Sequence, residues 1–230
     1  MDMLNHTVKS FDKEIAHLSD EINRLAMACS NQLEKAAIAF DLMDKGLAGK
    51  VAKDDEKVNV LERLIEDHAV RFLAKRQPMA VDLRFFLAAM KIAYELERIG
   101  DNAENIAKGV IFLKKRPDHG IVKRIVDMTA DCRSMLQEAV EAFLAMDADK
   151  ASAVWKRDEG IDESFKRIMG LVFDQTKGPC VDSFEDGTQI VLMARCIERI
   201  GDHITNIAED IYYIATGQNN LKQIMMKLDE

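Results

Sequence analysis

The sequence has few of the residues that interrupt helices. Its 230 residues include only 3 Pro and 11 Gly, and aromatic side chains make up 6% of the chain. The segments between these breakers are long and rich in Ala, Leu, Ile, Met, Glu and Lys, which favour helices or fill helix cores. We therefore expect an all-α fold.

Cysteine is also scarce, and long apolar runs are missing. Cys29, Cys132, Cys180 and Cys196 are scattered without a CxxC pair, and the start "MDMLNHTVKSFD" does not read as a secretory signal. Free thiols in a reducing, cytoplasmic environment are therefore expected. No run of about 18 apolar residues occurs, so we expect membrane contact only through partner proteins.

Basic residues are outnumbered, with 32 Lys and Arg against 40 Asp and Glu, for a net charge of −8. This charge repels a phosphate backbone, and the only obvious basic stretch is "LKKRP" at residues 113–117. We expect no nucleic-acid partner. With 48% hydrophobic residues the chain can bury the core of one large domain or two small ones.

The chain contains an internal repeat. A shift of 103 residues places "AIAFDLMD" (37–44) on "VEAFLAMD" (140–147), and "VAKDDEKVN" (51–59) on "VWKRDEGID" (154–162). A shift of 101 places "LERIGDNAENIA" (96–107) on "IERIGDHITNIA" (197–208), so the second copy is two residues shorter in between. The chain therefore carries two copies of one unit.

Each copy contains three segments in which apolar residues recur at spacings of three and four, the pattern of amphipathic helices. Short connections favour antiparallel neighbours, which predicts two pseudo-symmetric three-helix bundles side by side, six long helices in all. Residues 7–113 form the first bundle, residues 121–216 the second, and residues 217–230 a tail that is either a short docking helix or frayed. The expected helices run from Thr7 to Lys45, from about 47 to Pro78, from there to Pro117, and over 121–147, 149–176 and 187–216.

The third helix of each copy carries an acidic pair. Glu97 and Asp101 are four residues apart and lie on one helical face, as do Glu198 and Asp202. A Gly directly precedes each Asp, although Gly inside a helix costs roughly 1 kcal/mol relative to Ala. The missing Cβ would admit another backbone, or a bulky ligand such as a hydrated metal ion.

The middle helix of each copy offers a matching pair, Asp158 with Asp162 and Asp55 with Asn59. Up to four carboxylates around one point repel one another unless they are protonated or neutralised by cations. Oxygen ligands select hard cations such as iron, manganese or magnesium. Zinc is less expected, because no Cys or His has regular ligand spacing to these acids.

Histidines do not stand out in the sequence. His203 follows Asp202 but points about 100° away around the helix. No feature of the sequence marks His6, His17, His68 and His119 as ligands.

Acidic pairs at this spacing are more often solvated surface, and Arg98, Arg195 and Arg199 are available as ion-pair partners. The duplication favours a site instead, because Glu-Arg-Ile-Gly-Asp is unchanged between the copies whereas core residues differ.

The chain resembles the PhoU family of regulators associated with bacterial phosphate uptake. The resemblance rests on "HTVKSFDKEI", "RQPMAVDLR", "LERIGDNAENIA" and "IERIGDHITNIAEDIYYIATG", which span both repeats. It implies two PhoU repeats that bind multinuclear metal clusters through E(D)xxxD motifs. By position, the metal ligands are Asp55, Glu97 and Asp101 in one repeat and Asp158, Asp162, Glu198 and Asp202 in the other. Asn59 departs from the acidic pattern, although its carbonyl oxygen is able to coordinate.

The resemblance further implies a negative regulator of the phosphate regulon. Its partners would be the ATPase subunit of the Pst phosphate transporter and the sensor kinase PhoR, which acts with PhoB. We also expect a homodimer. Two other classes stay open, a metal-independent helical adaptor and a carboxylate-bridged di-metal enzyme. The enzyme is disfavoured because the helices that carry the acidic pairs lack the Glu-x-x-His motif of such sites. We therefore expect a non-enzyme.

Overall fold

A computed structural model describes residues 9–175 and 181–228, and every regular element within them is a helix. The all-α expectation is therefore confirmed. The first repeat comprises α1 (Lys9–Leu42), α2 (Lys45–Asp54), α3 (Glu56–Arg76) and α4 (Val81–Phe112). The second comprises α5 (His119–Ala145), α6 (Ala148–Lys156), α7 (Asp158–Gln175) and α8 (Val181–Thr216), and α9 (Leu221–Leu228) follows.

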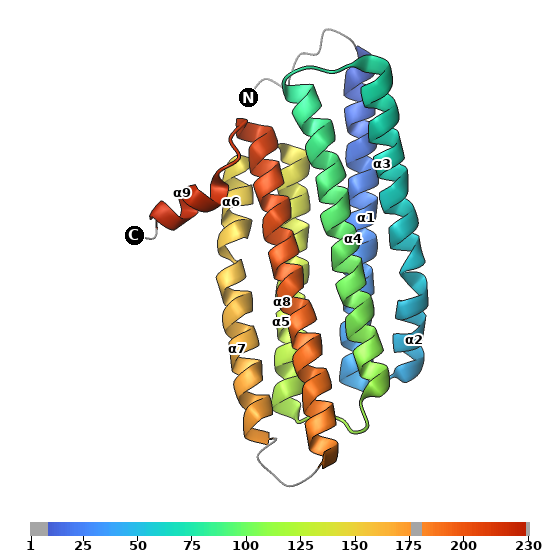
Figure 1. The fold of residues 1–230 in the computed structure, drawn as a ribbon, viewed down its shortest axis with the longest axis vertical. Coiled ribbons are helices and arrows are strands. Elements are labelled where there is room, and N and C mark those ends of the chain that lie inside the picture. The colour runs from blue at the N-terminus through green and yellow to red at the C-terminus, as the bar shows by residue number, and fades with distance from the viewer. Residues whose placement is uncertain (1–8, 176–180, 229–230) are drawn as a thin grey trace.

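The two repeats are built alike and stand side by side (Figure 1). In the first repeat α2 and α3 pack against α1 and α4, and in the second α6 and α7 pack against α5 and α8. Contacts of α4 with α8 and of α1 with α5 join the repeats. Buried apolar side chains from both repeats form one continuous cluster. The predicted pair of pseudo-symmetric three-helix bundles is thus present, with a shared core.

The middle helix of each repeat is broken, which the periodicity did not predict. The first break lies at Asp55, between α2 and α3, where the amide of Val58 donates to the carbonyl of Asp55 at 2.8 Å. The second lies at Arg157, whose carbonyl accepts from the amide of Gly160 at 3.1 Å. Such i→i+3 bonds tighten a helix locally. Neither break is at a Pro, and the apolar spacing continues across both, so the pattern predicted unbroken helices.

The turn after the first helix of each repeat is also shared. Met43 and Met146, which are 103 positions apart, both take left-handed backbone angles with φ near 53° and 52°. The following Asp44 and Asp147 then accept hydrogen bonds from amides in the first turns of α2 and α6. This turn ends α1 at Leu42, three residues before the predicted end.

The tail forms a docking helix, one of the two alternatives left by the sequence. Helix α9 contacts α8 and α6, and its Leu221 and Met225 are buried. No helix in the described ranges has the length and apolar character needed to cross a membrane.

Because the repeats share one core, an aromatic side chain that packs between them should contribute to the stability of the whole chain. Phe85 of α4 stacks on Phe143 of α5 with ring centroids 5.7 Å apart, and both are buried. Phe85→Ala should lower the free energy of unfolding by about 3–5 kcal/mol through the cavity it leaves. Phe112→Ala, at a side chain that is 68% exposed, is the control and should cost under about 1 kcal/mol. Denaturant titration would measure both, and equal costs would contradict the shared core.

Candidate cation-binding sites

The glycine motif of each repeat faces the break in the middle helix. A Cβ on Gly201 would overlap Oδ1 of Asp158, the first residue of α7. A Cβ on Gly100 would lie 2.9 Å from Cγ1 of Val58 and 3.4 Å from Oδ1 of Asp55. Side chains of the middle helix therefore fill the space left by the missing Cβ, a carboxylate at Gly201 and mainly the Val58 side chain at Gly100. The sequence-based expectation of a backbone in this space was wrong, and a hydrated ion beside the acids stays a prediction.

The second repeat brings its four predicted acids together. Burial, followed by the negative charges of Asp202, Asp162 and Glu198, raises the pKa of Asp158 to about 7. Burial and then the charge of Asp202 raise the pKa of Glu198, which is 8% exposed. Arg195 donates to one oxygen of Glu198, and Oε2, the other, is buried without a hydrogen-bond partner. The cluster therefore holds more negative charge than its neighbours compensate.

A cleft of about 750 Å³ opens beside these acids. Three of the four predicted acids of this repeat line it, and the sequence did not single out its other lining residues as site residues. The cleft is lined by Asp158, Asp162 and Asp202 together with Trp155, Lys156, Glu159, Thr205, Asn206, Glu209 and Lys222.

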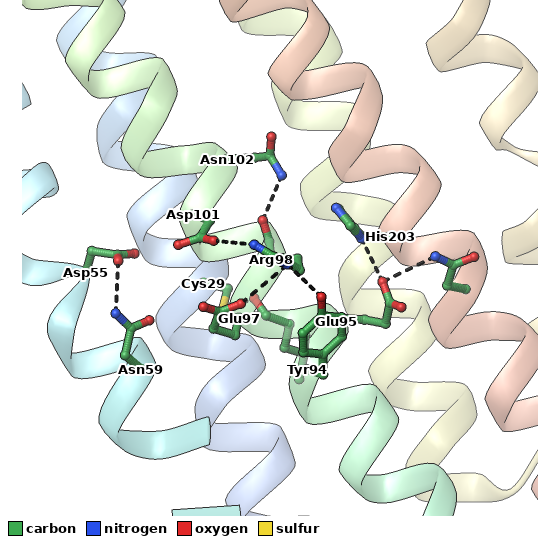
Figure 2. A network of polar contacts seen from close by, with 12 residues as sticks. Cys29, Asp55, Asn59, Tyr94, Glu95, Glu97, Arg98, Asp101, Asn102 and His203 are labelled. Atoms are coloured by element: carbon green, nitrogen blue, oxygen red, sulfur yellow. Dashed lines mark hydrogen bonds and ion pairs between the residues drawn. The ribbon is translucent and has the colours of Figure 1, made fainter. Parts of the chain in front are cut away.

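The first repeat brings Asp55, Asn59, Glu97 and Asp101 to one region, where α4 passes the break between α2 and α3 (Figure 2). Asn59 Nδ2 donates to Asp55 Oδ2 at 3.4 Å. Burial raises the pKa of Asp55, and that of Glu97, where the charge of Asp101 adds to it. Arg98 pairs with Asp101 at 3.0 Å.

Gln32 on α1 is a site residue that the sequence reading missed. Its Nε2 donates to Asp55 Oδ1 at 2.8 Å, which opposes the effect of burial on the pKa of Asp55. The 103-residue shift places the buried Met135 at the same position of the second repeat, where Asp158 has no such donor. The sequence could have indicated Gln32 through this shift, because the shift pairs a polar residue with an apolar one at a buried position.

The two buried cysteines are also equivalent under this shift. Cys29 Sγ donates to the carbonyl of Leu96 at 3.1 Å, and Cys132 Sγ to that of Ile197 at 3.6 Å. Burial raises the pKa of both thiols, and the nearby carboxylates of Asp55 and Asp158, respectively, raise it further. Both cysteines are therefore protonated and serve packing. Cys196 is a free, partly buried thiol, and Cys180 lies outside the described residues.

A histidine and two arginines beside the motif acids make contacts of their own. His203 points toward Glu95 of α4, with Nδ1 2.7 Å from Oε2 (Figure 2). Arg98 and Arg195 do form ion pairs with motif acids. Each neutralises part of its cluster, as the surface interpretation requires.

The oxygen atoms of the two acidic clusters are of the type that binds hard cations. However, they lie too far apart to bind a single bare ion together. Three buried oxygens in these clusters accept no hydrogen bond: Gln32 Oε1, Asn59 Oδ1 and Glu198 Oε2. Unpaired buried acceptors are costly, and a cation would satisfy them. However, within the described residues no three of the predicted acids bring ligand oxygens within 4.8 Å of one another. Hydrated ions, or more than one ion, fit this spacing and the open cleft better.

One group of side chains does converge within 4.8 Å, namely His17, Glu21 and His68. The interpretation that His17 and His68 have no partners that would indicate a ligand role was wrong. His17 and Glu21 are four apart on α1, which was the available signal, whereas His68 arrives from α3 only through folding. His119 is exposed, and His6 lies outside the described residues.

Comparison with known proteins finds matches over both repeats of the chain. A family model described as the PhoU domain matches residues 22–110 and 125–211. The phosphate-specific transport system accessory protein PhoU homolog of Caulobacter vibrioides is 37% identical over 96% of both chains. PhoU homolog 1 of Thermotoga maritima is 33% identical over 94% of this chain and 93% of its own.

Solved structures agree with these matches. The crystal structure of PhoU from Pseudomonas aeruginosa is similar with a TM-score of 0.84 and 32% identity, covering 90% of this chain and 100% of that chain. The phosphate transport system regulatory protein PhoU from Streptococcus pneumoniae gives a TM-score of 0.84 and 30% identity, covering 90% and 98%.

The buried acids predict a pH-dependent effect of Asp158→Asn on the chelator-treated protein. The ordinary pKa of Asp is 3.8, and in the folded state it is about 7. The ionised carboxylate is thus penalised by folding, and the wild type loses stability as the pH rises from about 4 to about 7. Asn removes this penalty. Allowing for partial exposure, it should stabilise the protein more at about pH 8 than at about pH 5, by on the order of 1–2 kcal/mol.

Thermal or denaturant unfolding at both pH values would measure this difference. Asp127→Asn, at an exposed position of α5, is the matched control and should show none. A gain from Asp158→Asn that is equal at both pH values would contradict a buried, ionisable carboxylate.

Proposed function

Because the chain belongs to the PhoU family, we propose that it is a cation-binding negative regulator of phosphate uptake and of the phosphate regulon. The regulatory part is supported by the relatives, whose names describe accessory and regulatory proteins of phosphate transport. The cation-binding part is supported by the two acidic clusters. In this proposal the protein acts in the cytoplasm, without catalysing a reaction.

The observation that carries the cation-binding part is the position of Asp158. Its carboxylate is held against Gly201 and beside three further acids, and its pKa is raised to about 7. An arrangement that leaves carboxylates this poorly compensated is unfavourable by itself. A bound cation such as iron, manganese or magnesium would supply the missing positive charge. Asp158 and Asp162 would hold it from α7, and Glu198 and Asp202 from α8.

The first repeat would hold its cation more weakly. Asp55, Glu97 and Asp101 supply the charge, and the free carbonyl oxygen of Asn59 supplies one neutral ligand atom. The hydrogen bond from Gln32 already satisfies part of Asp55. Because the affinity of oxygen sites follows the number of charged ligands, we place the tighter site in the second repeat.

The proposed partners follow from the family resemblance. They are the ATPase subunit of the Pst transporter and the sensor kinase PhoR, whose signal passes to PhoB, and the protein would meet the membrane only through them. A homodimer is part of the same proposal. Cation binding would change the charge that the acidic cleft presents to a partner.

A metal-independent adaptor is the second candidate. The ion pairs of Arg98 with Asp101 and of Arg195 with Glu198 favour it, because they already neutralise part of each cluster. Metal titration separates the two proposals.

Dilute chelator should strip the first site before the second, and Asn59→Asp should narrow the difference. Glu198→Ala combined with Asp202→Ala should abolish the tighter class of manganese binding and leave the helical circular dichroism spectrum unchanged. Elemental analysis and manganese titration would measure these outcomes. Equal affinities at the two sites, or unchanged metal content in the double variant, would support the adaptor without metal.

Gly201→Ala tests the second site without changing any charge. The manganese titration should show its effect. The new Cβ would displace the carboxylate of Asp158 and so weaken manganese binding in the second repeat. Gly170→Ala on α7 is the control, because its Cβ would meet nothing within 4 Å.

Deletion of the gene should leave phosphate-starvation genes expressed in phosphate-rich medium, because the repressing signal would be lost. Transcript measurement in high and low phosphate would test this outcome, with the restored wild-type gene as control. Normal repression in the deletion strain would count against the regulatory assignment.

A further inference from the structure

Imidazole and carboxylate groups converge where α1 packs against α3, on residues that the proposed function does not use. Glu21 lies between two histidines: its Oε1 is 3.7 Å from Nδ1 of His17, and its Oε2 is 3.0 Å from Nδ1 of His68. One ligand atom from each of the three residues lies within 4.8 Å of the others. The two rings meet edge to face with centroids 4.6 Å apart.

A second carboxylate contacts the other side of the His68 ring. Oε2 of Glu14 is 3.5 Å from Nε2 of His68, so the two ring nitrogens of His68 face different carboxylates. A metal-bound histidine commonly donates its second N–H to a carboxylate, which fixes the ring and the tautomer. With Nδ1 directed at the cluster, Glu14 is placed to accept from Nε2–H.

From this geometry we propose that His17, Glu21 and His68 form a binding site for a borderline divalent cation, zinc above all, with Glu14 as a positioning residue. Tetrahedral zinc lies about 2.0–2.2 Å from each ligand atom, which sets neighbouring ligand atoms roughly 3.3–3.6 Å apart. The distances from His68 Nδ1 to Oε2 of Glu21 and from His17 Nδ1 to Oε1 of Glu21, 3.0 and 3.7 Å, lie just below and just above this spacing. Three protein ligands leave the fourth position to water, and His17 is partly exposed to solvent.

The site belongs to the first repeat alone. The 103-residue shift places Gly120, Arg124 and Leu171 at the positions of His17, Glu21 and His68. These residues offer no ligand, and Arg124 carries the opposite charge to Glu21. The cluster is therefore not a requirement of the repeat fold. Its two imidazoles also separate it from the oxygen-only acidic clusters, because imidazole suits zinc, cobalt, nickel and copper better than magnesium or manganese.

Titration of the full chain with cobalt and zinc tests the site. Tetrahedral cobalt with imidazole ligands absorbs strongly in the visible region, whereas cobalt in an octahedral oxygen site absorbs weakly. We expect the strong absorption in the wild type and its displacement by zinc. His17→Gln and His68→Gln should each weaken zinc binding by at least about 100-fold, and Glu14→Gln by about 10- to 100-fold while the cobalt spectrum keeps its tetrahedral form.

Two controls separate this site from histidines in general and from the acidic clusters. His119→Gln removes an exposed histidine of α5 and should change nothing. Glu198→Ala with Asp202→Ala should leave the cobalt spectrum intact, whereas His17→Gln should leave manganese binding intact. The test of the histidine site therefore remains valid even when the acidic clusters bind no metal ion.

An NMR titration of the wild type makes the test independent of any variant's folding. Zinc should shift the imidazole nitrogens of His17 and His68 and leave those of His119 unchanged. Zinc affinity unchanged in the His17→Gln/His68→Gln double variant, or unshifted imidazole signals at saturating zinc, would overturn the proposal. The cluster would then be a set of ion pairs between α1 and α3.

Discussion

The close contact between the break in the middle helix and the glycine of the α4 or α8 motif is the constraint on which each repeat depends. Asp158 occupies the space that a Cβ of Gly201 would fill, whereas at Gly100 Val58 fills most of that space and Asp55 lies beside it. The contact lets the two helices approach closely, at the cost of burying a charged group. The interrupted middle helix, the raised pKa of Asp158 and the acidic cleft all lie around this contact.

The two repeats share this contact but compensate the buried charge differently. In the first repeat two amide side chains, Gln32 and Asn59, donate to Asp55. In the second repeat the equivalent positions hold Met135 and Asp162, one apolar and one acidic, and Asp158 experiences only burial and like charges. The two copies therefore keep the same helix contact at this site but differ in its electrostatics. The His17–Glu21–His68 cluster, found in one repeat, is a second divergence of the same kind.

Much of the fold and part of the candidate site could be predicted from residues alone. The spacing of buried residues such as Leu96, Ile99 and Ala103 reports which face of α4 meets the core, because a helix repeats its faces every 3.6 residues. The repeated Glu-Arg-Ile-Gly-Asp identified the acids that α4 and α8 contribute to the two clusters, and the four-residue pairs of the middle helices identified the others. The break at Asp55 could not be predicted, because it follows no Pro and the local backbone remains helical, with φ −58° and ψ −35°.

The sequence by itself determined the helical class, the duplication and the pairing of acids with glycines, since these depend on short-range periodicity and on comparison of the chain with itself. Only the tertiary structure decided what fills the space beside each glycine, which acids are compensated, and which histidines meet. His17 and His68 are 51 positions apart in the sequence, and Gln32 is 23 positions from Asp55. Such encounters depend on how α1 packs against the middle helix. No local pattern encodes that packing, because it results from the burial of apolar surface over the whole length of the helices.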